Sequence, residues 1–310
     1  MIINPKISVL MSVYNTEESL LKKAIESIQN QSFDDFEFII VNDGSGEYVD
    51  QLVSGYAIND SRIKLISQHN MGLTRALNNG LSQARGKYVA RLDSSDLSRK
   101  NRLLKQYELM ENNPDFVVCW TWFNVVDHNG IKLGRINFST CDWMIKRRML
   151  KSNIYAHSTA MFSRYKIIDI GGYCDKFVKA QDLELWLRLM RIKNAKFGAV
   201  PEYLVDYRYE TNSMTVSDDS DQSKFSKLAY YKFYTGRIPE NFQHIKYINN
   251  NFKYSRKNLY LINLFLRSGA NFKAKYLIKV ELNKKFSFNL FIKLLMSYFP
   301  IDWSNIYRFL

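Results

Sequence analysis

The strongest constraint on the fold is the alternation of strand-like and helix-like segments over the first 100 residues. The strand-like apolar runs span residues 6–13, 36–41, 63–67 and 87–92, and amphipathic helical patterns span 17–29 and 72–84. This order is typical of βαβ units, in which successive strands lie parallel in one sheet and helices cover its faces. The pattern therefore predicts an α/β fold with a mostly parallel central sheet flanked by helices.

Polar residues follow three of the expected strands. Tyr14 comes after the first strand, Asp43 after the second and Asp93 after the fourth. The carboxyl ends of parallel strands meet at one edge of the sheet, which is where ligands bind in such folds. Asp43 is suited to accept hydrogen bonds from a base or a ribose hydroxyl, or to cap a helix. Asp93 and Asp96 are suited to hold Mg²⁺ or Mn²⁺ on a diphosphate, or to begin the next helix.

Two later residues have a catalytic and a structural interpretation. Asp182 follows the pair Gly171-Gly172 at the start of a short helical pattern, so it either caps that helix or acts as a general base aimed into a cleft. His157 lies in an apolar stretch, where a hydrogen-bonded core histidine is the common case. The three cysteines form no C-x-x-C pair and the four histidines have no metal-ligand spacing, which argues against a zinc site. Neither a P-loop nor a dinucleotide fingerprint is present.

The formal net charge of +14 is concentrated near one end of the chain. Residues 221–310 carry 16 Lys and Arg against 4 Asp and Glu, and 21 of the 45 aromatic residues. Helical patterns, including an amphipathic one at 286–299, predict a basic, aromatic helical C-terminal region after a body of residues 1–220. This region could dock on an anionic membrane, bind a partner or form a solvated face. Nucleic acid is not an expected partner, because the charge lies outside the α/β body and no recognition motif accompanies it.

The sequence has no run of 18 apolar residues and no signal-peptide pattern at its start. The expected location is therefore the cytoplasm, with peripheral contact at the inner face of the membrane.

Five segments, in this order, resemble glycosyltransferase family 2, the inverting enzymes of the GT-A fold, and bacterial surface-polysaccharide enzymes in particular. They are ISVLMSVYN (7–15), FIIVNDGS (38–45), NMGLTRALNNG (70–80), YVARLDSSD (88–96), and Gly171-Gly-Tyr followed by AQDLELWLR (180–188). The resemblance covers about residues 6–210. It implies a GT-A domain over 1–220, with the nucleotide-binding part at about 1–100 and the acceptor part at about 101–220.

The resemblance also implies a role for individual residues. Asp182 would be the general base. The nucleotide-sugar would contact Ser12, Tyr14, Glu17, Asp43, Arg75 and Asp93. His157 and Arg208 would lie near the acceptor or the diphosphate. Asp93 and Asp96 would bind Mn²⁺ or Mg²⁺.

Two positions depart from the family pattern. Ser95 stands where the main metal-binding carboxylate is usual, so either Asp96 or a serine-held water replaces it, or the dependence on metal is weak. Gln181 replaces a frequent glutamate, which removes a like charge beside Asp182 and favours its ionised form.

The expected function is transfer of a sugar from a nucleotide-sugar, most simply a UDP-sugar, to a hydroxyl of a glycan or lipid-linked saccharide. The alternative is a non-catalytic nucleotide-sugar-binding or scaffold protein of a polysaccharide assembly complex.

Overall fold

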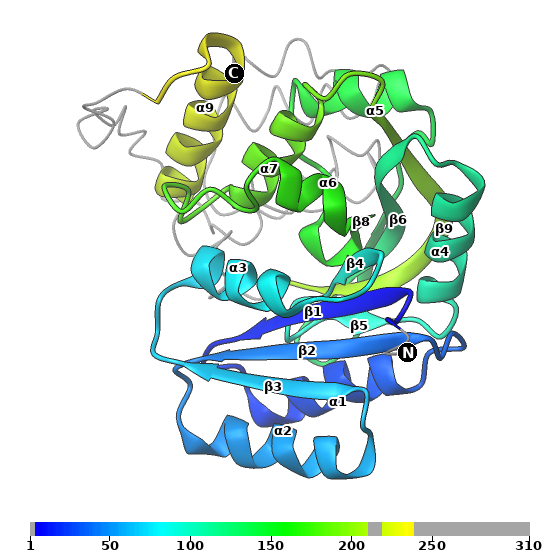
Figure 1. The fold of residues 1–310 in the computed structure, drawn as a ribbon, viewed down its shortest axis with the longest axis vertical. Coiled ribbons are helices and arrows are strands. Elements are labelled where there is room, and N and C mark those ends of the chain that lie inside the picture. Colours follow the sequence, from blue (N-terminus) through cyan, green and yellow to red (C-terminus); the bar gives the residue numbers. More distant parts are fainter. Residues whose placement is uncertain (1–3, 210–218, 239–310) are drawn as a thin grey trace, which may run out of the picture.

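The computed structural model describes residues 4–209 and 219–238 (Figure 1). A nine-stranded sheet has the order β3-β2-β1-β4-β8-β6-β9-β5, and β7 pairs with β6 outside this path. The first half of this sheet is formed by β1 (Ile7–Val13), β2 (Phe36–Asp43), β3 (Ile63–Gln68) and β4 (Tyr88–Arg91). These four strands are parallel, with Ile7 of β1 paired to Phe36 of β2 and to Tyr88 of β4. The α/β class and the parallel arrangement of these strands are confirmed.

Helices cover both faces of the parallel strands. Helices α1 (Glu18–Gln29) and α2 (Glu47–Asn59) pack on one face, and α3 (Leu73–Gln83) packs on the other (Figure 1). Side chains alternate along each strand, so Val9 of β1 joins the core under α1 whereas Leu10 joins the core under α3. Near-continuous apolar runs are therefore required, because both faces of these strands are buried.

One glycine sets the distance between α3 and the sheet. A Cβ at Gly80 would lie 2.3 Å from Leu10 Cδ1 and 2.9 Å from Val41 Cγ2. The absence of a side chain at this position lets the helix backbone approach β1 and β2 closely.

The second half of the sheet is mixed. Its strands are β5 (Leu97–Ser98), β6 (Phe116–Val126), β7 (Lys132–Ile136), β8 (Met161–Ser163) and β9 (Lys196–Arg208). Strand β8 is antiparallel to both β4 and β6, β9 is parallel to β6, and β5 is antiparallel to β9. Strands β6 and β7 form an antiparallel hairpin across Asn129-Gly130, a dipeptide that favours a tight reversal. The sheet is thus parallel through β4 and mixed beyond it.

Helices of the second half extend the same two parts of the core. These are α4 (Arg102–Asn112), α5 (Asp142–Met149), the short 3₁₀ helix η1 (His157–Thr159), α6 (Arg164–Asp169) and α7 (Gln181–Leu189). Trp120 of β6 and Trp186 of α7 are fully buried with their ring centroids 5.3 Å apart. This contact joins α7 to the sheet, which gives the first turn of α7 a fixed position.

Helix α9 (Asp219–Thr235) begins the basic C-terminal region and packs against α7. Lys232 bonds to Glu184 at 2.6 Å, and the Tyr230 hydroxyl donates to the Met149 carbonyl at 2.7 Å. The helix crosses the boundary expected at residue 220 and contacts the body directly. The remainder of the region, including the amphipathic segment 286–299, lies outside the described residues. Within the described ranges, no helix combines the length and apolar character needed to cross a membrane.

Candidate active site

The end of β1 presents an exposed aromatic side chain. Tyr14 is 53% exposed and directly follows the strand, while Ser12 within the strand is half-buried. Asn15 has a left-handed backbone with φ of 50°, and its N–H donates to Ser45 Oγ at 3.0 Å. The turns after β1 and β2 are therefore tied together. Glu17, on the same turn, is exposed and lies 3.5 Å from His128 Nε2.

Asp43, at the end of β2, is buried and organises the loop that leads to α3. Its Oδ1 accepts hydrogen bonds from Gln68 Nε2 at 2.7 Å and from the Met71 N–H at 2.8 Å, and its Oδ2 accepts one from the Gly72 N–H at 3.0 Å. The carboxylate is thus engaged by protein groups and holds the loop of residues 69–72 at the strand edge. Arg75 follows in the first turn of α3, is exposed, and lies 3.7 Å from Asp175.

Asp93 is the accessible carboxylate at the end of β4. Its side chain is 40% exposed, and its Oδ1 accepts a hydrogen bond from Arg91, whose guanidinium is completely buried. The same guanidinium donates to the Leu92 carbonyl at 3.1 Å, and the Asp93 N–H donates to Ser158 Oγ at 2.8 Å. A buried cation and a serine of η1 therefore fix Asp93 in position while one side of its carboxylate faces outward.

Asp96 and Arg208 form a buried structural link. Asp96 is 1% exposed, and its Oδ1 accepts a hydrogen bond from the Arg208 N–H at 2.7 Å. The Arg208 guanidinium is also buried and donates to the carbonyls of Ser95, Asp127 and His128. These bonds tie the end of β9 to the loops after β4 and β6. Asp96 faces the interior here and does not join Asp93 at the surface.

This arrangement tests the expected metal site. Among the described residues, no cluster of three or more His, Cys, Asp or Glu side chains could hold an ion. Mg²⁺, however, is usually held by one or two carboxylates together with substrate phosphates. Asp93 fits that limited role, and Asp96 does not.

Asp182 lies in the first turn of α7 and is half-buried. The residue before the helix, Ala180, has a left-handed backbone with φ of 52°, which is a strained conformation for alanine. Asn153 Nδ2 donates to Asp182 Oδ2 at 2.9 Å. A sharp turn and an amide from a loop 29 residues earlier thus aim this carboxylate.

The environment of Asp182 raises the pKa of its carboxyl above the ordinary value of 3.8. Burial is the main cause, and the hydrogen bonds from the Leu183 N–H and Asn153 oppose it. The charge of Asp93 adds to the increase, so the two carboxylates act on one another across the chain. An uncharged Gln181 was expected to favour the ionised form of Asp182. Burial and the charge of Asp93 instead leave the pKa of Asp182 raised.

His157 and Tyr173 form a buried, hydrogen-bonded pair. His157 Nε2 lies 2.8 Å from the Tyr173 hydroxyl, and its ring centroid is 5.9 Å from that of Trp186. Burial, assisted by the charge of Arg91, lowers the pKa of His157 well below 6.5. Burial raises the pKa of Tyr173, with contributions from Asp182 and Asp93. His157 is therefore neutral, as a hydrogen-bonded core histidine would be.

Three residues to which the sequence analysis gave no role interact with Asp93 or Asp182. These are Arg91, Asn153 and Tyr173. Tyr173 follows the glycine pair that carried part of the resemblance, and Arg91 lies beside Asp93, so position in the motifs could have indicated both. No pattern around Asn153 distinguishes it from other loop asparagines, because its contact with Asp182 exists only in the folded chain.

Comparison with known proteins gives a consistent result. The family model "Glycosyl transferase family 2" matches residues 8–171, just over half of the chain. A glycosyltransferase of Methanocaldococcus jannaschii, named as uncharacterised, is 31% identical over 282 residues, covering 89% of this chain and 94% of the relative.

Two further relatives carry names that mention a polysaccharide. The O-antigen biosynthesis glycosyltransferase WbnJ of Escherichia coli is 31% identical over 228 residues, covering 73% of this chain and 85% of the relative. The amylovoran biosynthesis glycosyltransferase AmsE of Erwinia amylovora is 31% identical over 204 residues, covering 65% of this chain and 75% of the relative.

Proposed function

The chain belongs to glycosyltransferase family 2 and is a glycosyltransferase, and from that premise we propose a specific reaction for it. It transfers a sugar from a UDP-sugar to a hydroxyl of a glycan or lipid-linked saccharide, with inversion at the anomeric carbon and with Asp182 as the general base. The names of two relatives, which refer to O-antigen and amylovoran biosynthesis, favour a surface polysaccharide as the product.

The observation that carries the proposal is the pairing of two carboxylates with different environments. Asp93 is accessible and bonded to a buried arginine, whereas Asp182 is more buried and has a raised pKa. The charge of Asp93, just after β4, contributes to the raised pKa of Asp182 on α7, which supports placing both carboxylates at one site. A base works best when its pKa lies close to the working pH, so the increase at Asp182 suits proton abstraction.

In the proposed reaction, the acceptor hydroxyl gives its proton to Asp182 as its oxygen attacks the anomeric carbon. The bond from that carbon to the diphosphate oxygen breaks, and the nucleoside diphosphate leaves with the electron pair. A single displacement inverts the configuration. Asn153 is a positioning residue, because its hydrogen bond to Asp182 Oδ2 directs the other carboxylate oxygen toward the acceptor.

The donor would lie along the carboxyl ends of β1, β2 and β4. Tyr14 offers an exposed ring to the base, with Ser12 and Glu17 beside it. Asp43 acts by holding the 69–72 loop in place, and Arg75 is exposed near the expected diphosphate. A divalent cation held by Asp93 and the diphosphate would neutralise charge on the leaving group.

The basic C-terminal region is proposed to bring the enzyme to an anionic membrane surface that carries its acceptor. Its excess of Lys and Arg over Asp and Glu, together with its many aromatic residues, supports that role. Truncation after residue 238 tests it, since the truncated protein should lose co-sedimentation with phosphatidylglycerol vesicles. Unchanged co-sedimentation would contradict the membrane role.

The reaction is tested by measuring release of nucleoside diphosphate from UDP-, GDP- and dTDP-sugars, each with Mn²⁺, Mg²⁺ or EDTA. We expect slow hydrolysis of one UDP-sugar that EDTA suppresses, and NMR of the released sugar should show inverted anomeric configuration. Retained configuration would overturn the single displacement. If no donor of the panel were hydrolysed and calorimetry detected no donor binding, a non-catalytic scaffold role would replace the proposed reaction.

A further inference from the structure

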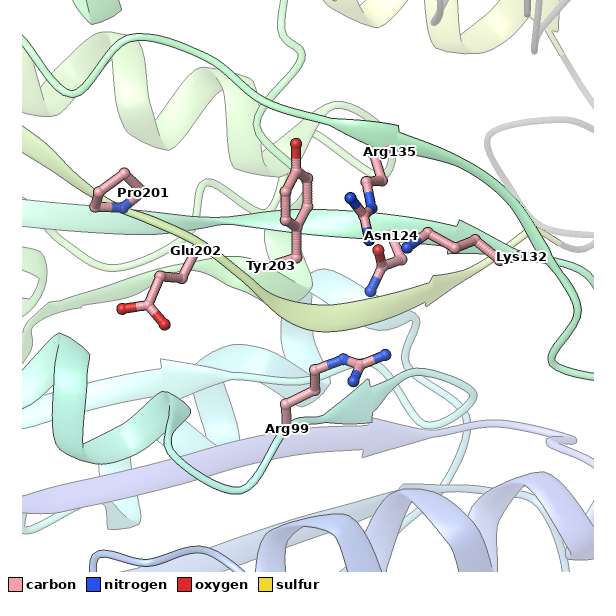
Figure 2. A pocket seen from close by; sticks show the side chains of 7 residues that line it. All are labelled: Arg99, Asn124, Lys132, Arg135, Pro201, Glu202 and Tyr203. Carbon is pink, nitrogen blue, oxygen red and sulfur yellow. The ribbon is translucent and has the colours of Figure 1, made fainter.

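A hollow of about 370 Å³ is lined by residues other than those of the candidate active site. Its walls come from β6, β7, β9 and the segment after β5 (Figure 2). In the sheet, β8 and β6 separate β4 from β9. None of the residues of the candidate active site lines this hollow. We call it the basic hollow and define it by Arg99, Asn124, Lys132, Arg135 and Tyr203.

Two of the cations in the basic hollow are held in place by neighbouring side chains. The Arg99 guanidinium donates from Nη2 to both carboxylate oxygens of Asp206 at 3.0 Å. The Arg135 guanidinium lies over the Tyr203 ring at 4.9 Å from its centroid, and Asn137 Nδ2 donates to the Tyr203 hydroxyl at 3.2 Å. Stacking of this kind orients the planar guanidinium and reduces the entropy that a ligand must overcome.

The positive charges in the basic hollow exceed the negative ones. Glu202 pairs with Lys105, and Asp206 is shared by Arg99 and Asn124. No ion pair to Lys132 or Arg135 occurs within residues 4–209 and 219–238. Burial lowers the pKa of Lys132, the charges of Arg135 and Arg99 lower it further, and the charge of Asp206 opposes them more weakly, so both arginines repel Lys132. An anion placed among them would relieve that repulsion.

Asn124 adds a hydrogen-bond acceptor to this group of cations. It is 2% exposed, and its Nδ2 donates to Asp206 Oδ1 at 2.6 Å. That bond fixes the orientation of the amide, because an ionised carboxylate only accepts hydrogen bonds. In the described part of the chain, Asn124 Oδ1 has no hydrogen-bond partner. A buried acceptor without a donor is costly, so a ligand that supplies a hydroxyl would gain stability here.

We propose that the basic hollow is an accessory binding site for a sugar that carries a carboxylate or a phosphate. The anionic group binds Lys132 and Arg135, and a neighbouring hydroxyl donates to Asn124 Oδ1. A neutral sugar lacks the first contact, and a simple carboxylate without a hydroxyl lacks the second. Such a ligand is either a free sugar acid or an acidic residue of a glycan chain. The proposal does not depend on the transfer reaction, because binding at this site requires no donor.

The test is an amide NMR titration of the full-length protein with glucuronate, glucose and acetate in turn. We expect glucuronate to shift the resonances of the β6, β7 and β9 residues of the basic hollow, with an affinity at least tenfold above that of acetate or glucose. A glucuronate-containing tetrasaccharide then distinguishes the source. Binding at least tenfold tighter than glucuronate assigns the site to a glycan chain, and equal binding assigns it to a free sugar acid.

The variants are Lys132→Ala with Arg135→Ala, and a control that removes the same charge elsewhere, Lys23→Ala with Lys193→Ala. Both control lysines are exposed and lie outside the hollow. The first pair should weaken glucuronate binding at least tenfold, whereas the control pair should leave it unchanged. Two results would overturn the proposal. One is an equal loss of glucuronate affinity in both double variants, and the other is acetate binding as tightly as glucuronate.

A milder variant guards against misfolding. Arg135→Lys keeps the charge but removes the stacked guanidinium, and it should weaken glucuronate binding by a smaller factor. Release of nucleoside diphosphate from the donor, measured in parallel, should be unaffected by these variants. Failure of the accessory site is therefore distinguishable from failure of the proposed reaction.

Discussion

The two halves of the sheet bring their residues to the candidate active site in different ways. In the parallel half, Tyr14, Asp43 and Asp93 each lie at or just after a strand end, and the ends of parallel strands share one edge. In the mixed half, Asp182 follows no strand. A left-handed turn at Ala180 and a long-range hydrogen bond from Asn153 aim it. Chain order thus places the residues of the proposed donor side, and tertiary contacts place Asp182, the proposed base.

The largest effect should come from the proposed base in the mixed half. Asp182→Asn removes proton abstraction and should reduce transfer by about 10²–10⁴-fold, roughly 3–5 kcal/mol in the barrier, with donor affinity unchanged. Kinetics of transfer and calorimetry of donor binding measure the two quantities. Asp169→Asn, on the exposed end of α6, is the control and should behave as the wild type. Near-normal turnover of the Asp182 variant would show that Asp182 is not the general base.

The contact of α9 with α7 should have the next largest effect. Glu184 is 2% exposed and bonds to both Arg188 and Lys232. Lys232→Met removes one partner of this buried carboxylate and should cost about 1–3 kcal/mol of unfolding free energy. Transfer should also fall, because α7 carries Asp182. Denaturant unfolding and turnover test this prediction.

Lys227→Met is the matched control, since Lys227 is exposed on the same helix. If both lysine variants had the same stability, the bond from Lys232 to Glu184 would contribute nothing to the position of α7.

In the parallel half, adding a single methyl group to α3 should lower the stability of the fold. Gly80→Ala places a Cβ against Leu10 and Val41 and should cost about 1–2 kcal/mol, after allowance for the better helix propensity of alanine. Gly55→Ala is an internal control in α2, because nothing lies within 4 Å of its added Cβ. That variant should gain about 0.5–1 kcal/mol. Thermal unfolding measures both changes in stability. If both variants were stabilised, or both destabilised, the close packing of α3 would be contradicted.

The smallest effect concerns a buried carboxylate in the parallel half and depends on pH. Burial raises the pKa of Glu37, but hydrogen bonds from Lys64, Ser8 and Arg85 outweigh it, so the net pKa is lowered below 4.5. Its ionised form therefore stabilises the fold above about pH 4.5, and this stability is lost as the pH falls through the lowered pKa of the folded state.

Glu37→Gln should accordingly cost about 1 kcal/mol near pH 7, and the difference from the wild type should shrink on acidification below pH 4.5. Chemical unfolding at several pH values measures the difference. Glu108→Gln, at an exposed position of α4, should show no such trend. A difference that grew on acidification would reverse the assigned direction of the pKa shift.

Much of the parallel half was predictable because its signals are local. Apolar runs of strand length, amphipathic helical spacing and polar residues at strand ends can each be identified within about ten residues. The hairpin of β6 and β7 and the helix that bears Asp182 were predictable for the same reason. The 13-residue strand β9 was not, because its pairing with β6 joins residues about 80 positions apart and includes irregular register.

The sequence by itself determined the α/β class, the family and the order in which strand ends carry polar groups, because periodicity and motif spacing are properties of short segments. Only the tertiary structure decided which carboxylates are accessible at the surface. Asp93 and Asp96 are three residues apart, yet buried Arg91 supports an accessible Asp93 while the Arg208 N–H holds Asp96 in the interior. The basic hollow also exists only after folding, because β6, β7 and β9 bring its cations together against their mutual repulsion. Burial and electrostatic interaction depend on distances in space, and sequence spacing does not specify those distances.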